Sequence, residues 1–292
     1  MALNIATFKT RAATAGVFVA VMMTGLLWNY WSFFILFSII HFGCWVEYHR
    51  IVCLIDNRYR DINPVHQYGV MLAGWCILLY FTNDAFTIFG FQVHVIGWCL
   101  GLIAVIVLPL AELLLAKQFE VKNIAYSAFG LLYISVSLGL MMDIRSFEMN
   151  IKEHRGPADM YGYVLPVGIL IAVWINDTMA YLVGSFIGKT PFSKISPKKT
   201  WEGTIGGGLL CIGLVAMLGW CTRLYKVTDW VAIAAIVAVF GVMGDLFESK
   251  LKRMAGVKDS GSIMPGHGGF LDRFDSLLLA TPFVWAYVVF FM

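Results

Sequence analysis

Carboxylates near the end of the chain have the spacing of a single helix face. Asp245, Glu248, Ser249 and Lys252 lie three, four and seven residues apart, and residues at these separations are neighbours on a helix. Carboxylate oxygens suit Mg²⁺, which usually takes one or two carboxylates together with the phosphates of a substrate. The pattern predicts a helix face that could hold a metal ion, with a salt-bridged amphipathic segment as the alternative.

A second acidic face follows, because Asp272, Asp275 and Ser276 are spaced to share one side of another helix. Pro265 and Gly266 lie between the two faces and can reverse the chain, so we expect the faces to approach each other. Carboxylates for a metal beside cations for phosphates are the groups that phosphoryl-type transfer requires. The cations of this region are Lys250, Lys252, Arg253, Lys258 and Arg273.

A lysine-rich loop, residues 188–203, precedes these faces in the chain. Ser196 suits an N-cap and Pro197 a first helical position, so we expect a helix to begin here, with Thr200 and Glu202 in its first turn. The free N–H groups of a helix start, beside two adjacent lysines, would attract phosphates. A loop that only orients the chain in a membrane is the alternative. The four lysines are Lys189, Lys194, Lys198 and Lys199.

Asn176 and Asp177 interrupt an apolar run. An ionisable side chain at such a position costs about 2.5–3.5 kcal/mol on insertion scales and normally faces a cavity or a partner. We therefore expect both residues to line a functional site; an Asp at the membrane end of a helix is the alternative.

The elements that position these residues follow from composition. The 292 residues are 60% hydrophobic and 13% charged, with a mean hydropathy of +0.77. These values exclude disordered, collagen-like and small disulfide-rich proteins, and they predict an all-α, polytopic membrane protein. Eight stretches lack Asp, Glu, Lys and Arg, and the first, 12–46, is too long for one span. Because Trp28, Asn29, Tyr30 and Trp31 suggest a tight interfacial turn within it, we predict about nine spans.

Orientation follows from the positive-inside rule. If the N-terminus is cytoplasmic and nine spans alternate, 16 of the 21 Lys and Arg residues fall inside and 5 outside. This bias predicts a cytoplasmic N-terminus, an outside C-terminus and cytoplasmic positions for both polar regions. The mixed charges of 143–159 predict a solvated outer loop without chemistry.

The two halves of the chain differ in character. We expect residues 1–160 to be a scaffold of transmembrane helices, and whether it makes oligomer contacts is left open. Residues 161–292 would form a catalytic transmembrane domain with cytoplasmic loops 185–202 and 245–275. A homodimer through Gly-rich helices is left open, and no nucleic-acid partner is expected.

One family matches these motifs. The positions Ser249, Lys252, Arg253, Lys258, Asp259, Gly261, Pro265, Gly266, His267, Gly268, Gly269, Asp272, Arg273 and Asp275 have fixed gaps across 27 residues. They resemble the signature of the phosphatidate cytidylyltransferase (CDP-diacylglycerol synthase) family. The segments 176–181 and 196–203 are also similar to that family, so the resemblance covers residues 174–285.

The resemblance implies a reaction in which CTP and phosphatidate give CDP-diacylglycerol and pyrophosphate with Mg²⁺, a second cation being left open. It implies metal binding by Asp245 and Asp272, with Asp275 and Glu248 as reserves, and catalytic roles also for Lys199 and Asp177. It implies a bacterial inner-membrane enzyme whose site faces the cytoplasm, among membrane lipids. The substrate-binding residues would be Asn176, Ser196, Lys198, Thr200, Glu202, Lys252, Arg253, Lys258, His267 and Arg273.

Two other functions use similar residues. A CTP-dependent polyprenol or dolichol-type lipid kinase would act on a lipid alcohol and release CDP. An ion-coupled transporter would use Asp177 and Asp245 as ion ligands, but it has no need of clustered phosphate-binding cations, and inverted repeats, common in such folds, are not evident in the sequence.

Overall fold

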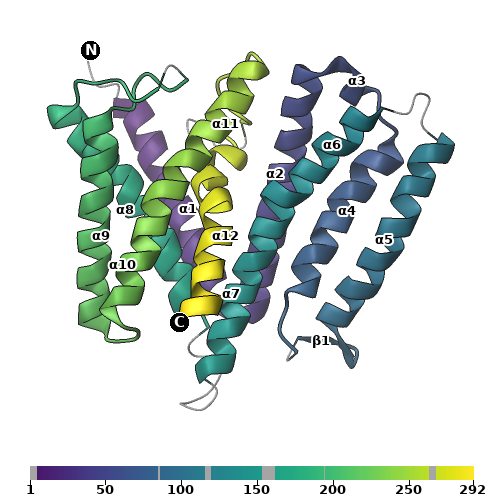
Figure 1. The fold of residues 1–292 in the computed structure, drawn as a ribbon, viewed down its shortest axis with the longest axis horizontal. Coiled ribbons are helices and arrows are strands. Elements are labelled where there is room, and N and C mark those ends of the chain that lie inside the picture. Colours follow the sequence, from purple (N-terminus) through teal and green to yellow (C-terminus); the bar gives the residue numbers. More distant parts are fainter. Residues whose placement is uncertain (1–4, 85, 116–119, 153–161, 194, 263–267) are drawn as a thin grey trace. The chain divides into compact units, whose positions relative to one another are not determined.

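The computed structural model describes residues 5–84, 86–115, 120–152, 162–193, 195–262 and 268–292, with side chains omitted for 5–13 and 148–152. Apart from a short hairpin, β1 (Thr87–Ile88) and β2 (Phe91–Gln92), every regular element described is helical, so the all-α prediction is confirmed. The helices of the first half are α1 (Ile5–Leu27), α2 (Tyr30–Ile55), α3 (Asn57–Arg60), α4 (Pro64–Tyr80), α5 (Val93–Leu115), α6 (Val121–Gly130), the π-helix η1 (Leu131–Val136) and α7 (Ser137–Lys152). Those of the second half are α8 (Val164–Ile187), α9 (Trp201–Thr222), α10 (Val227–Ile236), the π-helix η3 (Val237–Gly241), α11 (Val242–Met254) and α12 (Leu271–Phe291) (Figure 1).

Seven helices of the described chain are long and apolar enough to cross a membrane. Two of them are composite, Val121–Phe147 through α6, η1 and α7, and Val227–Met254 through α10, η3 and α11. Two of the predicted spans are not among these seven helices. They correspond to α1, whose apolar part is Thr14–Leu27, and to the 17-residue α4. A polytopic membrane protein is therefore the architecture, while nine remains the predicted number of spans.

The expected break within 12–46 is confirmed. Helix α1 ends at Leu27 and α2 begins at Tyr30. Asn29 caps α2: its side chain accepts a hydrogen bond from Ser32 N at 2.8 Å, and Asn29 N donates to Ser32 Oγ at 3.0 Å. This reciprocal capping satisfies N–H groups that would otherwise lack partners at the helix start.

The chain forms two compact units. One comprises Met1–Ser146 with Met254–Arg273, and the other Phe147–Arg253 with Phe274–Met292. The first unit thus includes the segment Met254–Arg273, which belongs to the predicted catalytic half of the sequence. The predicted loop 245–275 is helical up to Met254 and again from Leu271, and the predicted loop 185–202 is non-helical only between Ile187 and Trp201.

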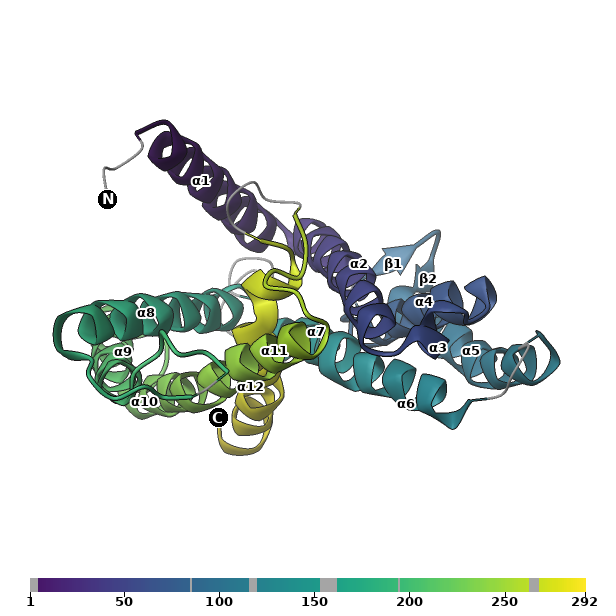
Figure 2. The ribbon, with the colours of Figure 1, turned by 90° about the horizontal axis from the view of Figure 1, so that it is seen from above.

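Within the first unit, α4 packs along α5 (Figure 2), and a buried polar cluster joins these helices to α3 and α6. His66 Nδ1 lies 2.6 Å from Glu112 Oε2, and its Nε2 lies 2.7 Å from Ser127 Oγ. The hydroxyl of Tyr59 lies 3.2 Å from the same Ser127 oxygen. Burial raises the pKa of Tyr59 to about 12, so this phenol stays protonated at neutral pH.

Arg145 corrects the prediction of a solvated loop over 143–159. The residue lies in α7 and is 2% exposed. Its Nη1 donates to the carbonyl oxygen of Leu26 at 3.0 Å, and its guanidinium carbon lies 5.1 Å and 4.6 Å from the ring centroids of Tyr30 and Phe33. Aromatic faces and a carbonyl offset the desolvation of the cation. Residues 148–152 continue the helix, and residues 153–161 are outside the described chain.

Within the second unit, α8 and α9 pack closely along their length (Figure 1). A Cβ atom at Gly207 would lie 2.4 Å from the Cα of Ala180, so only glycine permits this approach. The contact places the second half of α8 against the start of α9, and the loop between the two helices closes over them.

The start of α9 differs from the prediction. The helix begins at Trp201, and Thr200 is its N-cap, with Thr200 Oγ1 accepting from Gly203 N at 3.2 Å. The segment around Ser196 and Pro197 instead forms turns, and Lys199 N donates to Ser196 O at 3.1 Å. Backbone pairing across the loop moves the cap by four residues, since Phe192 N donates to Lys199 O at 2.8 Å.

Candidate active site

A polar cavity of about 570 Å³ lies in the second unit, among α8, the loop 188–200, α9 and α11. Seven of the predicted site residues line it, so the fold brings them to one cavity although they are distributed over 70 positions of the chain. These are Asn176, Asp177, Ser196, Lys198, Lys199, Thr200 and Asp245.

An ion pair joins the loop to α11 at this cavity. Lys199 Nζ contacts Asp245 Oδ2, and Ser249 Oγ donates to Asp245 Oδ1 at 3.2 Å from one turn further along the same helix. Asp177 interacts electrostatically with both members of the pair. Asp245 and Ser249 thus share one face of α11, and this face places the Asp245 carboxylate beside the Lys199 ammonium group.

Asn176 contributes a polar atom that lacks a partner. The residue is 2% exposed, and its Oδ1 has no hydrogen-bond partner among the described residues. A buried acceptor left in this state costs about 1–3 kcal/mol. Because Asn176 lines the cavity, a bound donor or cation would satisfy this oxygen.

Asp275 lies in α12 and is buried. Its carboxylate interacts electrostatically with Asp245, Asp177 and Lys252, so three carboxylates of this unit influence one another. The described residues contain no group of three or more His, Cys, Asp or Glu side chains in the geometry of a metal site. Mg²⁺ needs only one or two carboxylates, with phosphates and water completing its shell, so this oxygen-rich donor set fits it.

The side chain of Glu202 holds the loop 188–200 by accepting hydrogen bonds from the backbone of the loop. Its carboxylate accepts hydrogen bonds from Thr190 N at 3.1 Å, Thr190 Oγ1 at 2.8 Å and Lys189 N at 3.2 Å. Trp201 N donates to Thr190 O at 3.0 Å beside these contacts. Glu202 was predicted to bind substrate, whereas the geometry gives it a part in shaping the loop that carries Lys198 and Lys199.

The other predicted residues that the structure describes are not among the residues that line this cavity. Glu248 is fully buried and forms an ion pair with Lys252 on α11, while Arg253 lies in the last turn of that helix. Lys258, Asp272 and Arg273 belong to the first unit, and His267 is outside the described residues.

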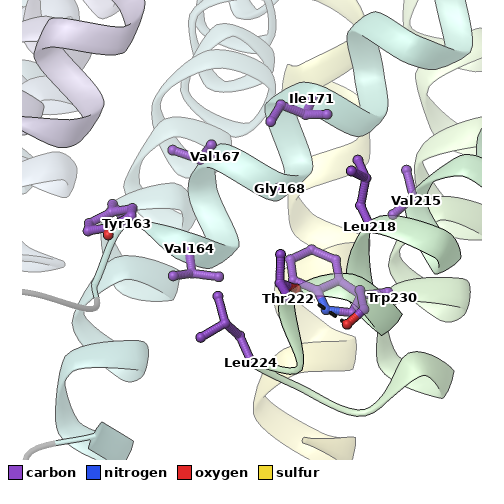
Figure 3. Close-up of a pocket in the computed structure, with 11 residues that line it drawn as sticks. Tyr163, Val164, Val167, Gly168, Ile171, Val215, Leu218, Thr222, Leu224 and Trp230 are labelled. Carbon is purple, nitrogen blue, oxygen red and sulfur yellow. Dashed lines mark hydrogen bonds between the residues drawn. The ribbon is translucent and has the colours of Figure 1, made fainter.

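A second cavity of the same unit is apolar (Figure 3). It has a volume of about 240 Å³ and lies between the start of α8 and the end of α9. Val164, Gly168, Leu218 and Trp230 are among its lining residues, none of which is charged. Its lining therefore offers no charged side chain to a phosphate.

Comparison with known protein families identifies the family of the chain. The model of the cytidylyltransferase family matches residues 9–291, so the chain belongs to that family, as its motifs predicted.

Curated relatives make the comparison more specific. The chain is 34% identical over 188 residues to a phosphatidate cytidylyltransferase of Bacillus subtilis, and 37% identical over 186 residues to one of Staphylococcus aureus. These alignments cover 64% and 62% of this chain and, in each case, 66% of the relative, just under two thirds of its length. A third relative of the same name, from Synechocystis, is 39% identical over 132 residues, which are 42% of this chain and 45% of the relative.

Proposed function

We propose that the protein transfers CMP from CTP to phosphatidate, giving CDP-diacylglycerol and pyrophosphate. The polar cavity carries this proposal, because it brings Lys198, Lys199 and Asp245 together in a helical membrane protein. The relatives named phosphatidate cytidylyltransferase support it. Phosphatidate and a nucleoside triphosphate are both anionic. This cavity offers cations and hydroxyls that suit phosphates, and a carboxylate that suits a metal ion.

The transfer needs positioning more than a strong base. An oxygen of the lipid phosphate forms a bond to the α-phosphorus of CTP, and the bond from that phosphorus to the β-bridging oxygen breaks, so pyrophosphate leaves with the electron pair. Lys198 and Lys199 neutralise the triphosphate and reduce the repulsion between the two anions. Thr200 and Ser196 border the same space.

Asp245 is the residue that we propose to hold Mg²⁺, with Asp177 and Asp275 nearby as carboxylates of the same electrostatic group. When bound, the metal neutralises phosphate charge and orients the phosphates. Asp272 as a second metal carboxylate stays a prediction from the family signature.

We further propose that the polar cavity faces the cytoplasm of a bacterium, in its inner membrane. Sixteen of the 21 basic residues fall on that side in the proposed topology, and the relatives are bacterial. CTP would arrive from the cytoplasm, and phosphatidate would arrive from the headgroup layer of the membrane.

A single assay tests the reaction. Purified full-length protein in lipid micelles receives labelled CTP, phosphatidate and Mg²⁺, and we expect a CMP-bearing lipid and pyrophosphate in equal amounts. Formation of CDP and a phosphorylated lipid from polyprenol would select the kinase instead. Absence of turnover with either lipid would contradict the proposal and favour the transporter.

Glu202 gives a prediction about the loop. In Glu202→Ala, the backbone N–H groups of Lys189 and Thr190 lose their acceptor, so the lysines that follow are held less firmly. We expect the KM for CTP to rise roughly three- to tenfold with a smaller change in kcat, the size that a few exposed hydrogen bonds can supply. Glu202→Gln keeps one acceptor oxygen and is the matched control. Equal KM values for the two variants would contradict the role of the Glu202 carboxylate in holding the loop 188–200.

A further inference from the structure

Glu47 is a carboxylate in the second half of a helix that is long and apolar enough to span a membrane. It lies in α2, within the span Tyr30–Ile55, and is 3% exposed. A buried ionised group of this kind is costly unless hydrogen bonds or charges offset its desolvation. Its hydrogen-bond partners Ser260, Phe270 and Leu271 belong to the same unit.

The carboxylate of Glu47 binds the beginning of α12. Phe270 N donates to Glu47 Oε1 at 2.9 Å, and Leu271 N donates to Glu47 Oε2 at 2.8 Å. These N–H groups lie at a helix start, where no intrahelical carbonyl is available and the helix dipole favours an anion. Glu47 therefore caps α12 from a helix more than 200 positions earlier in the chain.

Two glycines leave the space that this carboxylate occupies. A Cβ atom at Gly261 or at Gly269 would lie 2.1 Å from Glu47 Oε1. Both glycines belong to the family signature. Their lack of a side chain is explained by a residue outside that signature.

Ser260 connects Glu47 with Asp272. The Ser260 hydroxyl lies 2.6 Å from Glu47 Oε2 and 2.9 Å from Asp272 Oδ2, and it can donate to either. Asp272 Oδ2 also accepts from Ser260 N and from Gly269 N, each at 2.8 Å. The same short segment thus holds both carboxylates, so a change at Glu47 reaches the orientation of Asp272.

We infer that Glu47 is a positioning residue for the transfer reaction: it fixes Ser260 and the start of α12 at Phe270 and Leu271, and so sets the orientation of Asp272. Both oxygens of Glu47 accept hydrogen bonds from protein groups, so its contacts are those of an anchor for the segment rather than of a group that meets substrate. The inference rests on the proposed function for its effect on catalysis, while the anchoring itself does not depend on it.

The central test is Glu47→Gln. The amide has one acceptor oxygen instead of two, and its NH₂ group would face a backbone N–H or the Ser260 hydroxyl. We expect kcat to fall roughly 10- to 100-fold, the KM for CTP to stay within about threefold, and the Mg²⁺ concentration for half-maximal activity to rise, since the loss of a charge-assisted cap removes orientation rather than CTP contacts. Glu112→Gln is the control, because Glu112 is likewise buried in this unit, at 4% exposure, and pairs with His66 outside the site.

Hydrogen exchange separates the anchoring from the activity. We expect the amides of Gly269, Phe270 and Leu271 to exchange faster in Glu47→Gln than in the parent protein and in Glu112→Gln. If the amides exchange faster in Glu47→Gln but the parent protein shows no cytidylyltransferase activity, the proposed function is refuted and the anchoring stands. Unchanged exchange, or kcat and Mg²⁺ dependence equal to those of the parent, would overturn the inference.

A second variant covers the case in which Glu47→Gln does not fold. Ser260→Ala removes the hydroxyl between the two carboxylates and leaves the Glu47 contacts to Phe270 and Leu271 in place. We expect it to fold, to lower kcat and to raise the Mg²⁺ requirement. Normal kcat and Mg²⁺ dependence in Ser260→Ala would overturn the proposed connection to Asp272.

Discussion

Asp245→Asn is expected to lower kcat by about 10³-fold, the upper range for removing one preorganised electrostatic group from an active site. The substitution keeps the shape of the side chain but removes its charge, and with it the ion pair to Lys199 and the proposed metal ligand. Lys199 can still donate a hydrogen bond to the amide oxygen, so the fold should be retained. Steady-state kinetics with CTP, phosphatidate and Mg²⁺, together with the thermal midpoint of the purified protein, measure both effects.

Asp229→Asn is the matched control for Asp245→Asn. Asp229 belongs to the same unit and is also largely buried, but it accepts a hydrogen bond from Tyr287 Oη at 3.1 Å and does not line the polar cavity. The hydroxyl of Tyr287 can donate equally to an amide oxygen. Asp245→Asn with near-parent kcat, or an equal loss in both variants, would contradict the metal assignment.

Lys199→Met is expected to lower kcat/KM for CTP by about 10²- to 10³-fold, in the range measured for groups that stabilise developing charge in a protected site. Met has a similar length and no charge. The change leaves Asp245 without its cation, and it leaves the triphosphate without one of the two adjacent lysines. The effect should appear in both kcat and KM, because Lys199 would meet the phosphates before and during the transfer.

Lys189→Met tests whether position matters beyond total charge. Lys189 lies in the same loop but does not line the polar cavity, so we expect kcat/KM within about threefold of the parent, the size of a solvent-screened surface charge. Similar losses in Lys189→Met and Lys199→Met would show that the loop acts only through its net charge, and would remove Lys199 from the proposed site.

Much of the architecture could be predicted from local patterns. Apolar stretches without charges mark helices because lipid offers no partners for free backbone groups, and Asn29 marks the break between α1 and α2 through its capping geometry. The positions of Asp245 and Ser249 on one face of α11 follow from helix periodicity alone. These features depend on residues within a turn or two of one another.

Other local predictions failed where distant residues changed the surroundings. Arg145 was expected in solvent, and instead the rings of Tyr30 and Phe33 and the carbonyl of Leu26 surround it. Pairing across the loop 188–200 moved the cap of α9 from Ser196 to Thr200. Periodicity and capping preferences carry no information about such partners.

The residue types, the membrane class and the family motifs were therefore readable from the sequence, because each depends on composition or short spacing. The tertiary structure decided which of these residues meet. Close packing at Gly207 places α8 against α9 beside the polar cavity. Glu47 has no local feature that marks it, since the N–H groups that it caps lie 223 and 224 positions further along the chain. Hydrogen bonds over such separations exist only once the helices have packed, and for that reason the anchor of the family signature appears only in the folded protein.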